Sequence, residues 1–258
     1  MKGISVIIIT YNEAKKIGAT LDAAWKVADE IIVADSGSTD STPEICLAKG
    51  VRFITMAWQG FGQQRNAAMA LALHHHILAL DADEVLDEQL IKNILEVKQQ
   101  GFPQNIYSVQ RKNFYYGKFI LHGMEKGDIK PRLHHRDVAK WNHKAVHENL
   151  EWSAGIKPFV LKGYLLHYSY NNIAEHIDKT NKYTTLAAND YYLAGKAEPG
   201  IIKLVASPAF TFIKAYVINA GFLDGWHGWI LAKMHANAVL QKYAKLKMIY
   251  FEKRNGPK

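Results

Sequence analysis

The chain has a single cysteine, Cys46, among 258 residues. A lone cysteine excludes an internal disulfide framework and a zinc site built from thiolates, and it is typical of proteins in a reducing compartment. No uncharged apolar run reaches the roughly 18 residues that indicate a membrane-spanning helix, so we expect none. Residues 1–10 lack a small-residue cleavage site and are followed at once by Glu13, which predicts a first β-strand rather than a signal peptide.

Positive charge is in excess only in the last quarter of the chain. The net charge is +8, and residues 196–258 carry 10 Lys and Arg against 3 Asp and Glu, whereas residues 1–195 carry 22 against 21. A surface of this kind attracts polyanions, which include nucleic acid, anionic lipid and acidic saccharides.

The first hundred residues alternate between strand and helix patterns. Apolar, β-branched runs predict strands at 5–10, 30–34, 51–55 and 76–80, with helices between them. This order predicts an α/β fold with a mostly parallel sheet and helices on both faces. Residues 105–170 predict smaller, partly antiparallel strands. The rest of the chain predicts three helices, at 173–193, at 199–220 and from 224 onward.

Polar clusters follow three of the predicted strands. They are Thr10-Tyr11-Asn12-Glu13, Asp35-Ser36-Gly37-Ser38-Thr39-Asp40 and Asp81-Ala82-Asp83-Glu84. The carboxyl ends of parallel strands meet at one edge of the sheet, which is where open α/β sheets bind ligands. Taken alone, Asp35 is as typical of a turn residue as of a binding residue, and Asn12 is as typical of a helix cap. Their shared position favours a binding site.

The Asp81-x-Asp83 pair has the most specific chemical interpretation. Two carboxylates just beyond a buried strand can hold one hard divalent cation, Mg²⁺ or Mn²⁺, and orient a diphosphate on it. The alternative is an acidic turn that begins a helix.

Four segments together resemble the family 2 glycosyltransferases with the GT-A fold. In order and spacing they are residues 6–13, 33–40, 62–68 and 78–84. The resemblance implies a GT-A catalytic domain at 1–170, with a nucleotide-binding half at about 1–100 and an acceptor half at about 101–170. A helical extension rich in basic and aromatic residues follows at 171–258, and we expect it to face a membrane.

The resemblance also implies roles for individual residues. The expected contacts to a UDP-sugar donor are Thr10, Tyr11, Glu13, Asp35, Arg65 and Asp81. Within this set, Asp35 would accept a hydrogen bond from uracil, and Arg65 would lie near the diphosphate. Asp83 would bind the metal together with Asp81, and His167 would be a further metal ligand, with a buried structural imidazole as the alternative.

Inverting transfer requires a base that takes the proton of the acceptor hydroxyl. The expected base is Glu148, in a Val-His-Glu element similar to that of enzymes which add glucose to the lipopolysaccharide inner core. The sequence lacks the Glu-Asp pair that many family members carry in this region, so Glu125 and Asp128 remain alternatives.

The last 63 residues combine the basic excess with nine aromatic side chains. Lysines beside large rings are typical of helices at a lipid–water interface, although packing against the catalytic domain is the alternative.

The resemblance and the basic C-terminal segment together lead us to expect an inverting, metal-dependent transfer of a sugar, glucose by resemblance, from a UDP-sugar to a lipid-linked saccharide. The expected acceptor is inner-core heptose, at an anionic membrane surface on the cytoplasmic face of the inner membrane.

Two other functions remain open from the sequence. The acceptor could instead be a polyprenyl phosphate or a capsule precursor. A basic module that binds nucleic acid through its C-terminal helices is the non-enzymatic alternative. It would leave the polar clusters at the sheet edge without a role, so we expect no nucleic-acid partner.

Overall fold

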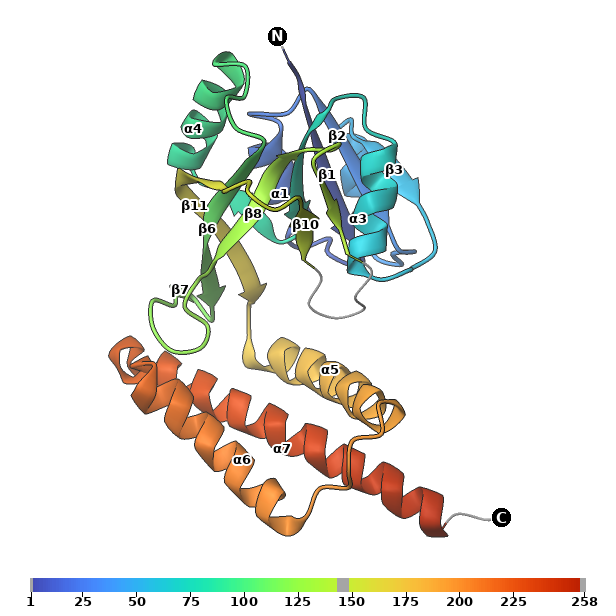
Figure 1. Ribbon diagram of the computed structural model, residues 1–258, viewed down its shortest axis with the longest axis vertical. Coiled ribbons are helices and arrows are strands. Elements are labelled where there is room, and N and C mark those ends of the chain that lie inside the picture. The colour runs from blue at the N-terminus through green and yellow to red at the C-terminus, as the bar shows by residue number, and fades with distance from the viewer. Residues whose placement is uncertain (1, 143–148, 256–258) are drawn as a thin grey trace. The chain divides into compact units, whose positions relative to one another are not determined.

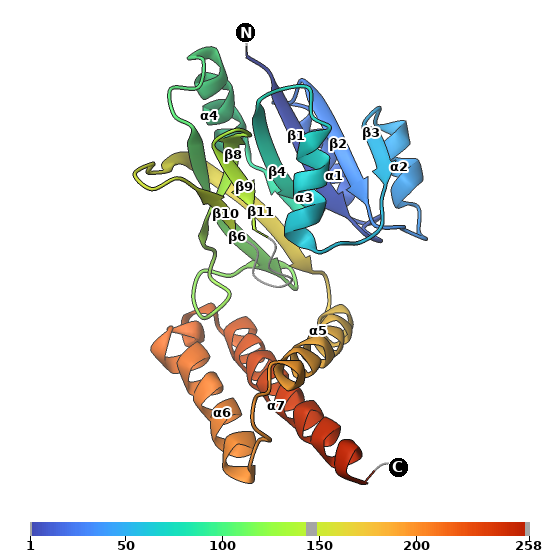
Figure 2. The same cartoon turned by 45° about the vertical axis from the view of Figure 1, so that its right-hand side comes forward.

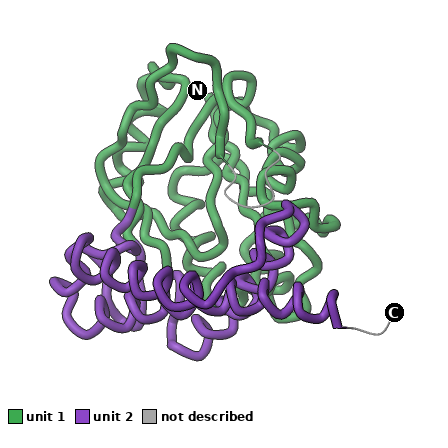
Figure 3. Tube along the Cα trace, turned by 60° about the horizontal axis from the view of Figure 1, so that its bottom comes forward, with its two compact units in different colours: residues 1–112, 128–168 green, residues 113–127, 169–258 purple. Residues whose placement is uncertain are grey.

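The computed structural model describes residues 2–142 and 149–255. It divides into two compact units, coloured separately in Figure 3: residues 1–112 with 128–168, and residues 113–127 with 169–258. The chain thus leaves the first unit for a short excursion, returns to it, and then forms the second. The functional division predicted at residue 170 stays a prediction.

The first unit contains the predicted parallel strands. They are β1 (Ile4–Thr10), β2 (Glu30–Asp35), β3 (Arg52–Thr55) and β4 (His76–Asp81), in the spatial order β3-β2-β1-β4 (Figure 1). All three pairings are parallel. Every residue of β1 is buried, as expected for the central strand of a sheet covered on both faces. The predicted parallel sheet is confirmed.

Alternate residues of these strands fill two separate cores. Val6 and Ile8 of β1 face a core that also contains residues of α1 (Ile17–Ala24) and α4 (Glu88–Gln99). Ile7 and Ile9 face the other core with α3 (Phe61–Ala70). Figure 2 shows these helices around the sheet, with α2 (Thr42–Ala48) beside β3. β2 and β4 likewise contribute side chains to both cores. Burying each large apolar side chain stabilises the fold by up to about 1.5–3 kcal/mol, so these three strands join the two cores.

The sheet continues beyond β4 with strands from later in the chain. The order is β4-β8-β6-β11-β5, comprising β8 (Ile129–His135), β6 (Ile106–Tyr115), β11 (Phe159–Tyr170) and β5 (Glu84–Leu86). The pairings β4–β8, β6–β8 and β11–β5 are antiparallel, as expected. β6 and β11 have 10 and 12 residues and are longer than the small strands expected. Separately, β9 (Ala139–Trp141) and β10 (Leu150–Trp152) form a two-stranded sheet.

The second unit, residues 113–127 with 169–258, is the helical unit and consists mainly of three helices. They are α5 (Ile173–Leu193), α6 (Ile201–Ile213) and α7 (Trp226–Asn255), at the positions predicted from the sequence. α6 continues as a π-helical turn over Lys214–Ile218, and a 3₁₀ turn at Gly221–Asp224 leads into α7. A short strand, β7 (Lys118–Phe119), pairs with the end of β6. α7 packs against both α5 and α6 and lies between them in both views (Figure 1, Figure 2).

One helical segment exposes an unusual amount of apolar surface. The 18 residues of Ile201–Ile218 have a mean hydropathy of 1.6, and 6% of the segment is buried. By length and composition alone it is apolar enough to cross a membrane, although the sequence has no uncharged apolar run of that length. Lys203 and Lys214 interrupt the apolar run, but the residues between and around them keep its mean hydropathy high.

Candidate functional site

The strand ends bring the predicted polar clusters to one edge of the sheet. Thr10 pairs with Asp35 of β2, and Ile9 pairs with Asp81 of β4. Neighbouring strands lie about 4.8 Å apart. Asp35 and Asp81 therefore flank the end of β1 from its two sides, and the convergence expected from the sequence is confirmed.

Hydrogen bonds tie together the loops that follow β1 and β2. The Asn12 side-chain oxygen accepts from the Thr39 N–H at 2.7 Å, and the Asn12 N–H donates to Ser38 Oγ at 2.8 Å. Asn12 adopts a left-handed backbone with φ of 55°, which asparagine tolerates better than most residues. The loops after β1 and β2 therefore support each other at this edge of the sheet.

Asp35 organises its own loop. Its Oδ2 accepts hydrogen bonds from the backbone N–H groups of Gly37 and Ser38, both at 2.8 Å, and the residue is 1% exposed. Asp35 therefore stabilises the turn after β2, which was the alternative interpretation of this residue. A carboxylate has about four acceptor positions, so contact with a uracil ring stays a prediction beside it.

Thr10 carries a hydroxyl without a partner. The residue is buried, and across the described parts of the chain no group forms a hydrogen bond with its Oγ1. Leaving a buried hydroxyl unpaired costs about 1–3 kcal/mol. Such a group is available to a ligand at the end of β1. Of the other two residues expected here, Tyr11 is exposed and Glu13 lies 3.8 Å from the Lys16 amine.

Two arginines hold the Asp81 carboxylate. Arg65 of α3 pairs with Oδ1, and Arg132 of β8 lies 3.1 Å from Oδ2. The Arg65 guanidinium also lies over the Trp141 ring, 4.6 Å from its centroid. Burial by itself would raise the pKa of Asp81, but the two guanidinium charges outweigh it and hold the pKa well below its usual value. Asp81 is therefore an anion fixed between two cations.

Arg132 also binds a fully buried glutamate. Its Nη2 is 2.5 Å from Oε1 of Glu84, and Arg111 of β6 lies 3.7 Å from the same oxygen. Burial raises the pKa of Glu84, and the carboxylate charges of Glu84 and Asp81 raise that of Arg132 although burial opposes it. Neither arginine was predicted from the sequence. Arg132 lies among both polar and apolar residues in β8, so no apolar pattern marked it as buried.

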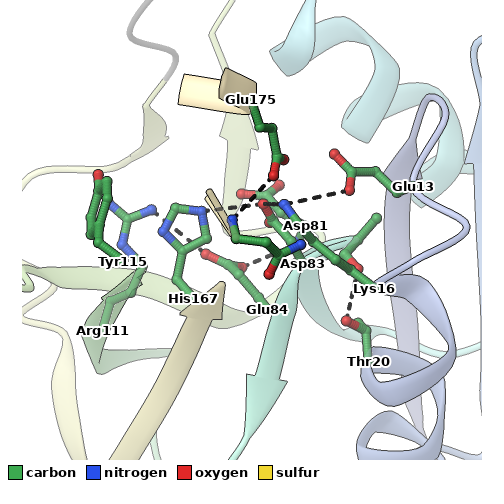
Figure 4. Close-up of polar contacts among 12 residues, drawn as sticks. Glu13, Lys16, Thr20, Asp81, Asp83, Glu84, Arg111, Tyr115, His167 and Glu175 are labelled. Atoms are coloured by element: carbon green, nitrogen blue, oxygen red, sulfur yellow. Dashed lines mark hydrogen bonds and ion pairs between the residues drawn. The ribbon is translucent and has the colours of Figure 1, made fainter. Parts of the chain in front are cut away.

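Asp83 points away from these arginines toward a different pair of cations. Its Oδ2 is 3.8 Å from the Lys16 amine and 3.5 Å from Nε2 of His167, which projects from β11 (Figure 4). Burial would raise the pKa of Asp83, but His167 outweighs it and the pKa is lowered. Burial likewise opposes charge on His167, yet Asp83 raises its pKa. Each group thus favours the charged form of the other, and binding of a metal ion by His167 would require loss of the imidazole proton.

A match to a known protein family identifies the type of protein that carries this site. The family described as "Glycosyl transferase family 2" matches residues 5–164, which include the ends of β1, β2 and β4 and both arginines, whereas His167 of β11 lies just beyond the match. The chain is a family 2 glycosyltransferase. The parallel order β3-β2-β1-β4 with its antiparallel continuation is accordingly the GT-A fold, as the sequence predicted.

Similar proteins cover nearly the whole glycosyltransferase chain. An uncharacterized glycosyltransferase of Rickettsia prowazekii is 28% identical over 272 residues, covering 99% of this chain and 90% of its own length. The lipopolysaccharide core biosynthesis glycosyltransferase LpsC of Rhizobium meliloti is 26% identical and covers 93% of both chains. These alignments include the helical unit as well as the GT-A sheet.

Solved structures resemble a smaller part of the chain. Glucosyl-3-phosphoglycerate synthase from Mycobacterium tuberculosis, in complex with Mn²⁺, UDP and glucosyl-3-phosphoglycerate, aligns with a TM-score of 0.37 at 22% identity over 44% of each chain.

The chemistry around Asp83 fits a divalent cation. Asp83 is ionised and lies within 3.5 Å of an imidazole nitrogen of His167. Mg²⁺ requires only one or two carboxylates in addition to water and phosphate oxygens. Asp81 contributes less to such a site as it stands, because each of its oxygens already contacts an arginine. Asp83, His167 and Asp81 remain the predicted ligands of the glycosyltransferase.

A second group of potential metal ligands lies at the opposite end of β4. Within residues 2–142 and 149–255, His75, His135 and Asp137 are the group whose ligand atoms all lie within 4.8 Å of one another. His75 precedes the first residue of β4, whereas Asp81 is the last. This group is therefore separate from the predicted donor site.

The predicted base falls outside the described residues, since Glu148 lies in the segment 143–148. Both alternative carboxylates are already paired. Asp128 lies 3.0 Å from Arg111 and 3.1 Å from Lys130 in the first unit. Glu125 belongs to the second unit and bonds to Tyr115 and His235. Glu148 stays the predicted base of the glycosyltransferase.

Proposed function

We propose that this glycosyltransferase transfers a sugar from a UDP-sugar to a membrane-held saccharide, with inversion at the anomeric carbon and with dependence on Mg²⁺ or Mn²⁺. Glucose is the expected sugar, and inner-core heptose of lipopolysaccharide is the expected acceptor. The observation that carries the proposal is the set of ionised carboxylates and buried arginines at the ends of β1, β2 and β4. Similarity to LpsC over 93% of the chain supports the acceptor.

The nucleoside would lie across the end of β1. Asp35 and Thr10 occupy neighbouring positions there, with a carboxylate on one side and an unpaired hydroxyl on the other. A uracil N–H can donate to the carboxylate of Asp35, while the exposed ring of Tyr11 can cover the base.

Departure of the nucleotide is the step that needs positive charge. When the bond between the anomeric carbon and the diphosphate breaks, negative charge grows on the leaving phosphate. Arg65 and Arg132 are fixed by Asp81 before the reaction, so they stabilise this charge without reorganising. A cation held by Asp83 and His167 would supply Lewis-acid stabilisation of the same phosphates.

The acceptor hydroxyl attacks from the face opposite the leaving group. It forms the new C–O bond and gives its proton to a carboxylate, for which Glu148 is the proposed base. This single displacement inverts the anomeric configuration.

Attachment to a membrane is proposed for the helical unit. The basic excess of residues 196–258 attracts anionic lipid, with about 1 kcal/mol for each basic residue near the surface. Ile201, Ile202 and Val205 of α6 are 72%, 80% and 64% exposed and would enter the lipid interface. The cytoplasmic face of the inner membrane is the proposed location, because UDP-sugars and anionic lipid are both available there.

The test is a transfer assay with the full chain. UDP-glucose and other UDP-sugars are each supplied with Mn²⁺ or with EDTA, and lipopolysaccharide truncated to its inner core is the acceptor. We expect transfer of one sugar with Mn²⁺ and none with EDTA, and release of UDP in equal amount. Transfer that is equally fast in EDTA would refute the metal dependence. Salt-sensitive binding to duplex DNA without any turnover of UDP-sugars would refute the enzymatic function.

A further inference from the structure

A groove of about 490 Å³ lies within the helical unit. Its floor is α7, with Met234, Ala238 and Lys242 one turn apart, and its walls come from α5 and α6. Figure 1 and Figure 2 show α7 between the other two helices. The volume falls in the range of about 300–1,000 Å³ that is typical of small-molecule sites. All of its lining residues belong to the helical unit.

One end of the groove is formed by a buried polar cluster. Tyr115 donates a hydrogen bond to Glu125 at 2.6 Å, and Nε2 of His235 lies 2.8 Å from the other oxygen of the same carboxylate. The ring of Tyr170 stacks on His176 at 4.1 Å between centroids. These groups brace one another, so this end of the groove has a fixed shape and presents polar atoms.

The α5 wall is polar where a structural helix would be apolar. Its buried residues are His176, Thr180, Thr184 and Ala188, and the first three of these line the groove together with Tyr183. A helix that merely packs against its neighbours buries an aliphatic stripe. The Thr184 hydroxyl is engaged by hydrogen bonds with Asn181, Gln241 and Lys245. The Thr180 hydroxyl and the tyrosine rings suit a ligand with hydroxyl groups and apolar ring faces, which is the chemistry of a saccharide.

Two lysines add positive charge to the groove. Within the described segments, neither Lys214 nor Lys242 forms an ion pair with a carboxylate. The Lys242 amine lies 4.5 Å from the ring centroid of Tyr191 and donates a hydrogen bond to the hydroxyl of that residue at 3.3 Å. The one carboxylate of the lining, Glu125, is already paired with His235. An anionic group is therefore the ligand that the lysines favour, and lysine is a common phosphate binder.

The groove opens beside an exposed aromatic side chain of α6. Phe210 lines it and is also 60% exposed, on the same helix as the exposed Ile201 and Ile202. A ligand in the groove could therefore keep a lipid portion in the membrane on which α6 lies.

We propose that this groove binds the phosphorylated saccharide headgroup of a membrane glycolipid, with Lys214 and Lys242 contacting a phosphate ester and the α5 wall contacting the sugar. The proposal rests on the proposed function, because it describes how that acceptor is held. It adds that the acceptor carries phosphate and that the helical unit, rather than the GT-A sheet alone, recognises it.

Flotation of the full chain with vesicles tests the proposal. Three vesicles are compared: phosphatidylcholine alone, phosphatidylcholine with phosphatidylglycerol, and phosphatidylcholine with lipid A, a phosphorylated glucosamine disaccharide, at matched charge. The variants are Lys214→Ala and Lys242→Ala, and Lys253→Ala is the matched control because it removes the same charge from α7 outside the groove. We expect each groove variant to bind lipid A vesicles about tenfold more weakly than the control, with phosphatidylglycerol binding equal among the three.

Two results would overturn the proposal. The first is equal binding of lipid A vesicles by the groove variants and the control. The second is an equal loss on lipid A and phosphatidylglycerol vesicles, which would make the lysines general membrane contacts. Filling the groove by Ala238→Trp is a second probe, and unchanged lipid A binding in that folded variant would also refute it.

The donor site provides a separate readout. Binding of UDP with Mn²⁺ is measured for each variant and should not change. If wild-type protein fails to bind UDP but still prefers lipid A through these lysines, the proposed function fails while the groove proposal stands.

Discussion

Asp81 and Asp83 are separated by one residue, yet their carboxylates have different partners. Asp81 holds Arg65 and Arg132, whereas Asp83 faces Lys16 and His167. This division follows from the turn at residues 82–83 that ends β4, because in a continued extended strand two residues separated by one would face the same side. It predicts that Asp81 positions the cations for the diphosphate and that Asp83 is the main metal ligand.

Asp83→Asn should therefore remove metal-dependent transfer. We expect a loss of at least about a hundredfold in kcat, because the leaving phosphate loses charge stabilisation that acts in the transition state. The measurement is transfer rate against Mn²⁺ concentration. Asp22→Asn, which neutralises an exposed carboxylate of the same unit, is the control. Wild-type turnover in Asp83→Asn would exclude its role as metal ligand.

Glu125→Gln tests the buried cluster of the helical unit. Burial opposes ionisation of Glu125, but His235 and Tyr115 outweigh it and lower its pKa to about 2. Because the pKa is lower in the folded protein, the ionised carboxylate stabilises the folded state at any pH above the pKa of the unfolded chain, about 4.3. This stabilisation is lost as the pH falls from there through the pKa of the folded protein. The variant should be less stable by about 3 kcal/mol at pH 7, with the difference shrinking below about pH 5. Urea unfolding at several pH values measures it, and a difference independent of pH would contradict the electrostatic origin.

At the scale of single elements, α3 matters because it carries Arg65 to the sheet edge. Its second residue is Gly62, where an added Cβ would lie 2.1 Å from the backbone oxygen of Asn142. The helix can therefore approach the β9–β10 sheet only with glycine at this position. The spacing of Gly62 and Arg65 is one turn, so any shift at Gly62 moves Arg65 relative to Asp81.

Gly62→Ala should weaken both stability and donor binding. Overpacking of this kind costs about 1–3 kcal/mol, and displacement of Arg65 should raise the Kd for UDP several-fold. Gly18→Ala in α1 is the matched control, because its nearest neighbour would be a methyl carbon of Ile45 at 3.9 Å. Thermal unfolding and UDP titration measure the two effects. Equal behaviour of the two variants would show that the close approach is not required.

The parallel half of the fold and the edge it forms could be predicted from the sequence, because each strand, loop and helix follows locally along the chain. The pairing of β5 with β11 and of β4 with β8 could not, since the partners are far apart in sequence and no turn motif sets their register. Arg132 reaches the site through the pairing of β8 with β4, and Arg111 through the pairing of β6 with β8, so neither was predicted. His167 was found by its place at the end of an apolar run.

At the scale of the whole molecule, charge and exposed apolar surface are concentrated in the helical unit. Two contributions to membrane binding are expected from it: its lysines attract anionic lipid, and the exposed apolar side chains of α6 then insert into the interface. The two contributions differ in their response to salt, because screening acts on exposed charges and leaves apolar burial in place.

Ile202→Asp should separate these contributions. Ile202 is 80% exposed, so the substitution should leave the unfolding temperature unchanged while lowering binding to anionic vesicles about tenfold. Leu193→Asp, at an equally exposed position at the end of α5, is the control and should bind like wild type. Sedimentation with phosphatidylglycerol vesicles at low and high salt is the measurement. Equal binding by Ile202→Asp and wild type would exclude insertion of α6.

The most direct measurement is a calorimetric titration of UDP into the wild-type protein and into Asp83→Asn, each with Mn²⁺ and with EDTA. We predict that Mn²⁺ strengthens UDP binding to the wild type at least tenfold and has no effect on the variant. Equal UDP affinity in all four titrations, or an effect of Mn²⁺ that survives the loss of the Asp83 carboxylate, would contradict a metal-assisted donor site at the end of β4.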